Sequence, residues 1–229
     1  MQKKNIIFLI LIIGCIQPFS VSPKTNRIIF FLQNLFKIKS GQVGSVTPSS
    51  NQTGKAMSYY VANHNGGPKN ILEVGAGPGS GITEDIVANM EPQDRLTLVE
   101  VNPEFVTILH EKYDHHANIS IVQADILTFN PDQKFDYIIS TLPLTIFPKA
   151  FISQYFEHIQ ELSQPKGIVS YIQYIGFPRI RMFIDAILRK TALKEKMQLI
   201  EHFKSKWLLE SKKVLFNFPP TWVHHLQMA

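Results

Sequence analysis

The residues best suited to binding a small molecule lie in the segment ILEVGAGPGSGI, residues 71–82, and at the end of the next apolar run. Gly75, Gly77 and Gly79 would let the backbone turn sharply and approach a ligand where a Cβ atom would collide. Glu100 follows the third glycine by 21 residues, where a carboxylate can accept hydrogen bonds from both hydroxyl groups of a ribose. A serine follows the third glycine, so the pattern is E-x-G-x-G-x-G rather than the dinucleotide pattern G-x-G-x-x-G. This difference favours a nucleoside without a pyrophosphate.

A further acidic residue follows the third apolar run of this region. Asp125, in the segment IVQADIL, would accept a hydrogen bond from the exocyclic amine of an adenine, with Ala124 and Ile126 beside the ring. The alternative is that Asp125 caps a short helix or a turn. Together with the glycine-rich loop and Glu100, it predicts a site for an adenine nucleoside.

Short apolar runs alternate with amphipathic stretches from residue 70 onward, and this alternation predicts strands joined by helical crossovers. We expect an α/β fold with a doubly wound, mostly parallel, seven-stranded sheet. Segment 203–218 contains two β-like pieces, FKSKWLL and KVLFNF, which predict a C-terminal β-hairpin. The expected strands are 70–74, 96–100, 119–122, 135–139 and 167–173, and the expected helices are 50–64, 80–90, 103–113, 149–162 and 179–200.

Four of these segments, ILEVGAGPGSG, LTLVEVNPEF, VQADIL and FDYIISTLP, resemble the successive motifs of class I S-adenosylmethionine-dependent methyltransferases over roughly residues 68–175. The chain also resembles the bacterial phospholipid N-methyltransferases, which convert phosphatidylethanolamine towards phosphatidylcholine. That narrower resemblance rests on VGSVTPSS and KAM, on STLPLTIFP and on NFPP, and it extends over residues 40–222. The chain departs from the family pattern at Asn51–Gly54 and in its apolar N-terminus.

The resemblance implies a Rossmann-like fold and S-adenosylmethionine as the methyl donor. It assigns the donor-binding role to seven residues, which lie in the first three strands or in the loops that follow them. These are Glu73, Gly75, Gly77, Gly79, Glu100, Asp125 and Ile126.

The loop after the fourth strand would face the transferable methyl group, which gives Ser140, Leu142 and Pro143 the role of positioning the acceptor. Amino-methylating relatives often have Asn/Asp-Pro-Pro-Tyr in this loop. Here the loop reads STLPL, with no aromatic side chain to stack on a base, which favours an aliphatic amine over a nucleobase. Such an amine must lose its proton before it attacks. Candidates for the group that accepts the proton are Tyr59, Tyr60, Tyr174 and the carbonyl oxygens of the loop.

Composition and charge limit the possible functions. The chain has 229 residues, 45% apolar and 18% charged, which indicates a folded domain rather than a disordered chain. Its single cysteine cannot form an internal disulfide, and the pairs His115-His116 and His224-His225 lack further ligands at metal spacing, so no metal site is predicted.

The net charge of +5 is unevenly distributed along the chain. Residues 1–55 sum to +7, residues 56–165 to −9 and residues 166–229 to +7. Such asymmetry indicates a binding surface. The cations between Arg179 and Lys213 form either a solvated face or a second contact with lipid phosphates.

The N-terminus carries an apolar run, residues 6–16, behind Lys3 and Lys4. The run is shorter than the roughly 20 residues of a bilayer span. It fits an uncleaved membrane-inserting anchor; a secretory or lipoprotein signal, a wrongly assigned start and a buried helix are the alternatives. The cations that follow the run outnumber those before it, which favours retention on the cytoplasmic side.

Residues 24–39 place Ile28, Phe31, Leu32 and Leu35 at helical spacing among cations. They predict a basic amphipathic helix that lies in the headgroup interface or packs on the domain. The predicted divisions are an apolar segment 1–23, an amphipathic and ligand-covering region 24–67, and a methyltransferase domain 68–229.

The leading hypothesis is a monomeric phosphatidylethanolamine N-methyltransferase at the cytoplasmic face of the membrane. Its partners would be anionic membrane lipids, with no nucleic acid. The alternatives are an enzyme similar to the rRNA adenine N-methyltransferases and a non-catalytic membrane-associated scaffold.

Overall fold

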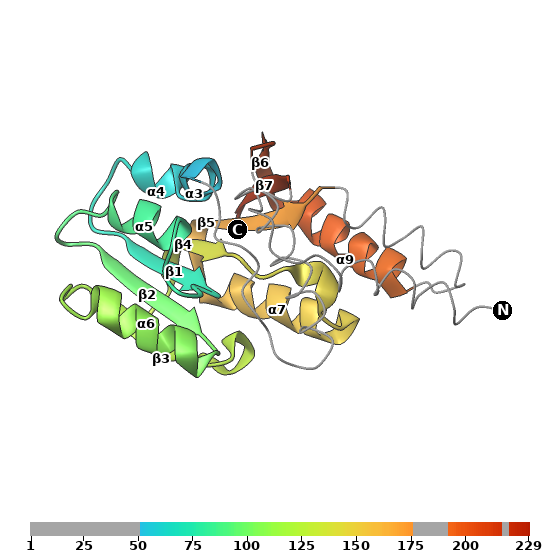
Figure 1. Ribbon diagram of the computed structural model, residues 1–229. Coiled ribbons are helices and arrows are strands. Elements are labelled where there is room, and N and C mark those ends of the chain that lie inside the picture. Colours follow the sequence, from blue (N-terminus) through green and yellow to red (C-terminus); the bar gives the residue numbers. More distant parts are fainter. Residues whose placement is uncertain (1–50, 176–191, 217–219) are drawn as a thin grey trace, which may run out of the picture. The chain divides into compact units, whose positions relative to one another are not determined.

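The computed structural model describes residues 51–175, 192–216 and 220–229, and these residues build one seven-stranded sheet in the order β3-β2-β1-β4-β5-β7-β6 (Figure 1). Strands β1 to β5 are parallel, and β7 runs antiparallel to both β5 and β6. The predicted doubly wound, mostly parallel, seven-stranded sheet is therefore confirmed. The strands are β1 (Asn70–Val74), β2 (Arg95–Glu100), β3 (Ile119–Gln123), β4 (Phe135–Ser140), β5 (Ser163–Tyr174), β6 (Leu208–Val214) and β7 (Thr221–Gln227).

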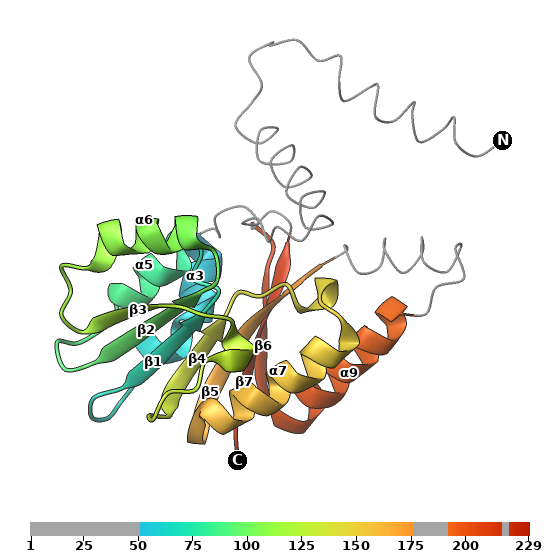
Figure 2. The ribbon, with the colours of Figure 1, turned by 90° about the horizontal axis from the view of Figure 1, so that it is seen from below.

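Helices cover both faces of the sheet (Figure 2). One face carries α3 (Asn51–Met57), α4 (Tyr59–Ala62), α5 (Ile82–Val87) and α6 (Pro103–Tyr113), and the other carries α7 (Lys149–Leu162) and α9 (Ala192–Trp207). Two short 3₁₀ turns, η1 (Ile126–Thr128) and η2 (Leu144–Ile146), follow β3 and β4. Within the described ranges, no helix has both the length and the apolar composition that crossing a bilayer requires.

The core consists of two apolar clusters, one on each face of the sheet. Because successive side chains of a strand point to opposite faces, Leu72 and Val74 of β1 pack toward α7 while Ile71 packs toward α5 and α6. On the α7 side, Phe156 stacks on Phe203 of α9 with ring centroids 4.0 Å apart. Both faces of β1, β2 and β4 are largely buried, which explains their nearly continuous apolar sequences, whereas the outermost strand β3 has no fully buried residue.

The C-terminal hairpin is where the predicted boundaries are wrong. Residues 203–207 belong to α9 rather than to a strand, and the second strand of the pair is 221–227, after the predicted segment has ended. Leu199, Phe203 and Trp207 recur every four residues and pack against the core, so helical spacing decides the structure of this segment. The other predicted strands and helices are confirmed as far as they are described, with β1, α6 and α7 at the predicted bounds.

Several predicted features lie outside the described residues. These are the apolar segment 1–23, the amphipathic helix 24–39 and the first part of the helix predicted over 179–200. The division of the chain at residues 23 and 67 therefore stays a prediction.

Candidate active site

The glycine-rich loop after β1 and the loop after β4 are joined directly by hydrogen bonds. The Thr141 N–H donates to Val74 O at 3.1 Å, and the Thr141 hydroxyl donates to Gly75 O at 2.6 Å. On the other side, the Gly75 N–H donates to Val99 O of β2 at 2.8 Å. The two loops predicted to bind the donor and to position the acceptor therefore form one structural unit at the carboxyl edge of the sheet, where ligands bind in open α/β folds.

The three glycines have positive φ angles, but their surroundings differ. A Cβ atom at Gly79 would come within 2.6 Å of side-chain atoms of Leu109 and Tyr113 on α6, so this glycine allows close packing of the loop on the helix. A Cβ atom at Gly77, where φ is 58°, would meet no atom within 4 Å. The backbone at Gly77 therefore borders open space, as a loop that admits a ligand requires.

Two residues of α6 fix the position of this loop. Lys112 Nζ donates to Pro78 O at 2.9 Å and to Ser80 Oγ at 3.1 Å, and the Tyr113 hydroxyl donates to Gly79 O at 2.7 Å. Burial raises the pKa of Tyr113 to about 12, so this hydroxyl stays a donor. The sequence analysis missed both residues, because a lysine in the last turn of a helix also suits the helix dipole and gives no sign of a loop contact.

Glu100 lies beside the glycine-rich loop, as predicted. Its Oε2 accepts from the Gly77 N–H at 2.8 Å, and its Oε1 accepts from the N–H groups of Val101 and Asn102, each at 2.9 Å. The side chain is 7% exposed. These bonds use three of the about four acceptor positions of a carboxylate, so Oε2 can still accept from one ribose hydroxyl, and the residues present fit a nucleoside.

Glu73 has the opposite environment to Glu100. It is 1% exposed, and its Oε2 has no hydrogen-bond partner among the described residues. Burial raises its pKa to about 8; the Thr83 hydroxyl opposes this shift and the charge of Glu100 adds to it. Glu73 is therefore largely protonated at neutral pH, and its acid proton is a potential donor to a group in the site.

The described contacts of Asp125 are those of a capping residue. Its Oδ1 accepts from the Leu127 N–H at 2.9 Å and so caps η1, which is the alternative that the sequence analysis left open. Ile126 is 5% exposed and packs in the core cluster on the α7 side. The proposed contacts of both residues with an adenine stay predictions.

The loop after β4, which we call the acceptor loop after its predicted role, lies above a group of buried hydroxyls. Ser140, at the end of β4, is fully buried and lies opposite Tyr171 of β5 in the sheet register. The hydroxyls of Ser140, Tyr171 and Tyr155 have no hydrogen-bond partner among the described residues. Burial raises the pKa of Tyr155 and the neighbouring Ser140 hydroxyl opposes this shift, so these two hydroxyls lie next to each other. Tyr171 also lines the depression at the ends of β4 and β5, where its hydroxyl can bind a water molecule.

A shallow depression opens beside this loop at the ends of β4 and β5. Leu142 packs beside Gly75, where a Cβ atom would be 2.9 Å from Leu142 Cδ2, and Pro143 forms part of the wall of the depression. Its lining residues are Pro143, Leu144, Thr145, Tyr171, Ile172, Gln173, Tyr174 and Ile200.

The three tyrosines considered as proton acceptors have different environments. Lys212 Nζ of β6 lies 3.1 Å from the ring centroid of Tyr59, and the Tyr60 hydroxyl donates to Glu210 Oε2 at 3.2 Å. Tyr174 lines the depression, and burial raises its pKa far above its usual value. A base with a strongly raised pKa would hold its proton at neutral pH, so Tyr174 is better suited to hydrogen bonding than to removing a proton.

The C-terminal histidine pair belongs to the core. His225 is fully buried and His224 is 4% exposed; burial lowers their pKa values to about 4 and about 3. In the part of the chain that the structure describes, no group of three or more His, Cys, Asp or Glu side chains is arranged to hold a metal ion.

Residues 71–167 match the family model of a methyltransferase domain. The chain is 28% identical over 148 residues to ornithine lipid N-methyltransferase of Singulisphaera acidiphila, and the match covers 62% of this chain and 75% of that protein. It is 37% identical over 86 residues to ribosomal RNA small subunit methyltransferase A of Mycoplasma mycoides, covering 34% of this chain and 31% of that protein. The second match is thus restricted to about a third of either protein.

Solved structures share the fold. N-methyltransferase NodS from Bradyrhizobium japonicum, in complex with S-adenosyl-L-homocysteine, matches with a TM-score of 0.58 and 16% identity over 77% of this chain and 86% of that chain. Magnesium protoporphyrin IX methyltransferase from Synechocystis matches with a TM-score of 0.57 and 13% identity, over 78% of this chain and 83% of that chain. The sheet order is that of class I methyltransferases, which confirms the predicted fold class.

Proposed function

We propose that this class I methyltransferase, which takes its methyl group from S-adenosylmethionine, transfers it to the amine of phosphatidylethanolamine and its methylated derivatives at the membrane surface. The observation that carries the proposal is the similarity to ornithine lipid N-methyltransferase, which extends over three quarters of that protein. Ornithine lipids and phosphatidylethanolamine both present an aliphatic amine on a lipid. Phosphatidylethanolamine is the acceptor that the resemblance to phospholipid N-methyltransferases implies.

The donor would be held at the carboxyl edge of β1 and β2. S-Adenosylmethionine supplies an electrophilic methyl group on a sulfonium centre. Glu100, fixed by the Gly77 N–H, would accept from a ribose hydroxyl through Oε2, and Gly77 leaves space for the ligand. Asp125 and Ile126 would contact the adenine, and the protonated Glu73 would supply a hydrogen bond from beneath the loop.

The acceptor would enter beside the loop after β4. Methyl transfer is an in-line displacement, so the protein mainly has to position the two reactants and exclude water. The amine would have to lose its proton before it could accept the methyl group. Ser140, Leu142 and Pro143 would position the amine, and a water molecule in the depression lined by Tyr171 would receive the proton.

The proposal places the protein as a monomer at the cytoplasmic face of the membrane. The basic segments on either side of the acidic central region support this placement, because anionic lipids attract clustered cations. The similarity to ornithine lipid N-methyltransferase supports the membrane location as well, because that relative is named for a lipid substrate.

An rRNA acceptor is the second candidate, favoured by the local identity of 37% to the ribosomal RNA methyltransferase. That identity is confined to 86 residues and 31% of the relative. The STLPL loop also has no aromatic side chain after its proline to stack on a flipped base. We therefore treat RNA methylation as an outcome that the test must distinguish.

The test is a methylation assay with purified full-length protein and radiolabelled S-adenosylmethionine. Vesicles containing phosphatidylethanolamine, vesicles containing ornithine lipid, rRNA and small amines are offered separately. We expect label in phosphatidylethanolamine. Label in ornithine lipid alone would change the acceptor, label in RNA alone would contradict the lipid proposal, and no donor binding would favour a non-catalytic scaffold. Glu104→Ala, on the exposed side of α6, serves as the active control variant for substitutions in the site.

A further inference from the structure

The end of strand β6 exposes two large apolar side chains to solvent. Leu215 is 57% exposed and Phe216 is 83% exposed, although they are adjacent in sequence and follow the buried Val214. A single exposed apolar residue is ordinary on a protein surface. Leu208 and Leu209, at the opposite end of β6, are also exposed, by 44% and 45%, and lie next to the Lys206–Trp207 contact. What distinguishes Leu215 and Phe216 is their greater exposure and their position in the fold.

The position follows from the strand register. Thr221 of β7 lies opposite Tyr174, the last residue of β5, and Val214 of β6 lies opposite Thr221. Because β7 is antiparallel to both neighbours, Leu215 and Phe216 continue beyond the carboxyl end of β5. Leu215 and Phe216 therefore lie at the carboxyl ends of the strands, the same end of the sheet as the acceptor loop after β4.

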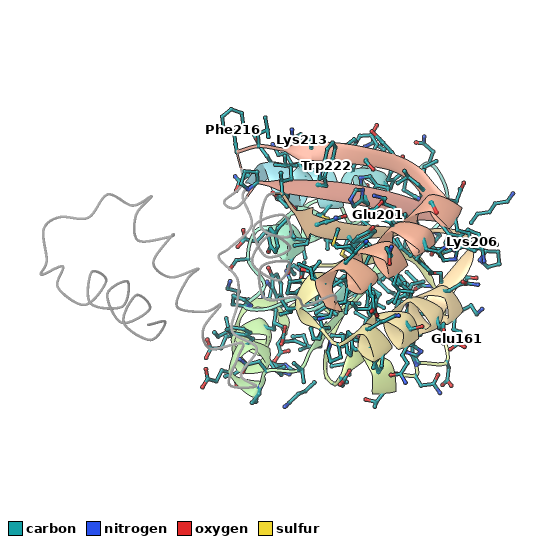
Figure 3. The ribbon with its side chains drawn as sticks, turned by 90° about the vertical axis from the view of Figure 1, so that its right-hand side faces the viewer. Glu161, Glu201, Lys206, Lys213, Phe216 and Trp222 are labelled. Carbon is teal, nitrogen blue, oxygen red and sulfur yellow. The ribbon has the colours of Figure 1, made fainter. Side chains whose placement is uncertain are left out.

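Cations and a tryptophan surround the apolar pair. Lys213 Nζ lies 5.8 Å from the ring of Trp222, which is partly buried on β7, and Lys212 Nζ lies over the ring of Tyr59. Figure 3 shows Phe216, Lys213 and Trp222 gathered at one end of the β6–β7 pair and Lys206 at the other end. We call Lys213, Leu215, Phe216 and Trp222 the β6–β7 tip.

This combination has the chemistry of a membrane interface. Lysines keep their charge in the headgroup region while their aliphatic stems cover apolar surface, and tryptophan prefers the boundary between polar and apolar layers. Exposed phenylalanine and leucine side chains gain free energy when they leave water for the acyl region. Glu210 of β6 accepts from the Tyr60 hydroxyl and forms an ion pair of 3.8 Å with Lys212, so these two charges offset each other. Lys213 is therefore the cation of this end of β6 that attracts an anionic surface.

We infer that the β6–β7 tip inserts Leu215 and Phe216 into the surface of an anionic bilayer, with Lys213 at the lipid phosphates. The inference rests on the proposed function, because it explains how a lipid amine reaches the acceptor loop without leaving the membrane. A second copy of the chain is the alternative occupant. The cations on the edge strand β6 oppose pairing of two such strands, because they would bring like charges together.

A fluorescent probe at position 216 tests the inference in the full-length protein. The native cysteine is removed with Cys15→Ser, and Phe216→Cys is labelled with an environment-sensitive dye. Leu208→Cys is the matched control, because Leu208 is 44% exposed at the opposite end of the same strand. The vesicles contain phosphatidylglycerol and a lipid-bound quencher but no amine lipid, so insertion is scored without any methyl transfer.

We expect the dye at position 216 to shift its emission to the blue and to be quenched by these vesicles, while the dye at position 208 is unaffected. In the unlabelled protein, Phe216→Ser should lower partitioning into the vesicles about tenfold, since a large apolar side chain is no longer buried. Leu208→Ser should leave partitioning unchanged.

Three results would overturn the inference or separate it from the proposed function. An unquenched dye at position 216 on protein that sediments with the vesicles would overturn it. A blue shift that depends on protein concentration without vesicles would also overturn it, in favour of self-association. Methylation of phosphatidylethanolamine without quenching would reject the tip alone, whereas quenching without lipid methylation would support the tip and reject the proposed acceptor.

Discussion

The two edges of the sheet differ in how fully their buried polar groups are paired within the protein. At the amino edge, Lys69 and Asp94 form an ion pair of 2.7 Å with both side chains at most 5% exposed. Asp94 also accepts from the N–H groups of Lys69 and Glu91, and Asp136 accepts from the Asn70 N–H at 2.8 Å. These carboxylates have their partners within the protein.

Toward the carboxyl edge, several buried polar atoms have no partner among the described residues. They include Oε2 of Glu73 and the hydroxyls of Thr83, Ser140, Tyr155 and Tyr171, whereas Glu100 at the same edge is held by three backbone N–H groups. Leaving a buried polar group unpaired costs about 1–3 kcal/mol, so the fold is less stable here than it could be. The difference between the edges indicates that one serves stability and the other keeps its hydrogen-bonding groups available for ligands.

The largest expected effect is at the amino edge. Asp94→Ala would leave Lys69 buried without its counter-charge, and we expect a loss of about 3–5 kcal/mol in the free energy of unfolding. Urea denaturation measures it. Asp114→Ala is the control, because its pair with His110 is exposed and its loss should cost less than about 1 kcal/mol. A similar small loss for both variants would remove the distinction between the edges.

The second prediction concerns the pH dependence of stability at Glu73. Its pKa is raised from 4.5 in an exposed state to about 8 in the fold, mainly by burial. The folded state therefore keeps a proton that the unfolded state releases. The stabilising effect of this proton is complete below pH 4.5 and is lost as the pH rises to 8.

Glu73→Gln does not titrate, so its stability relative to the wild type should increase across this interval by an amount on the order of 3 kcal/mol. Urea denaturation of both proteins at pH 5, 6.5 and 8 measures the difference. A constant difference between the two proteins would show that Glu73 has its partner in the fold. That result would place it with the amino-edge carboxylates.

The third prediction tests the carboxyl edge as a donor site. Glu100→Ala should weaken binding of S-adenosylhomocysteine by about 1–3 kcal/mol, because a buried hydrogen bond to the ribose is lost. Isothermal titration calorimetry measures the affinity, and the melting temperature shows whether the variant is folded. Glu104→Ala should bind as the wild type does. Unchanged affinity in a folded Glu100→Ala protein would place the ribose elsewhere.

Local patterns explain which elements could be predicted from the sequence. Helix α6 begins sharply because Pro103 fixes its first turn and the Asn102 side chain accepts from the Glu104 N–H at 2.9 Å. The glycine-rich loop and Glu100 could also be predicted, because their signal lies in residue spacing along the chain. In the structure the two are joined by the hydrogen bond from the Gly77 N–H to Glu100.

The features that sequence reasoning missed depend on contacts between distant segments. Residues 203–207 are helical, and Phe203 stacks on Phe156 of α7, a contact between distant segments that the β-like composition of FKSKWLL does not indicate. The unpaired hydroxyls of Tyr155 and Tyr171 become visible only when α7 and β5 are placed beside each other. A tyrosine in an apolar stretch gives the same signal whether or not its hydroxyl has a partner.

The smallest expected effect concerns Lys112, a positioning residue that connects α6 to the glycine-rich loop. Lys112→Met keeps the length of the side chain but removes the hydrogen bonds to Pro78 O and Ser80 Oγ. The loop would then have to be ordered when the donor binds, and we expect the KM for the donor to rise about fivefold, since about 1 kcal/mol of hydrogen bonding is lost.

Because Lys112 does not touch the acceptor loop in the described contacts, kcat at a saturating donor concentration should stay near the wild-type value, and Lys112→Arg should restore most of the affinity. Lys134→Met, in an exposed turn before β4, is the control and should change neither constant. A fall in kcat with an unchanged KM would contradict the positioning role. It would mean that a fixed conformation of the glycine-rich loop is needed for the methyl-transfer step rather than for binding of the donor. Preorganisation at the carboxyl edge would then lower the barrier to transfer.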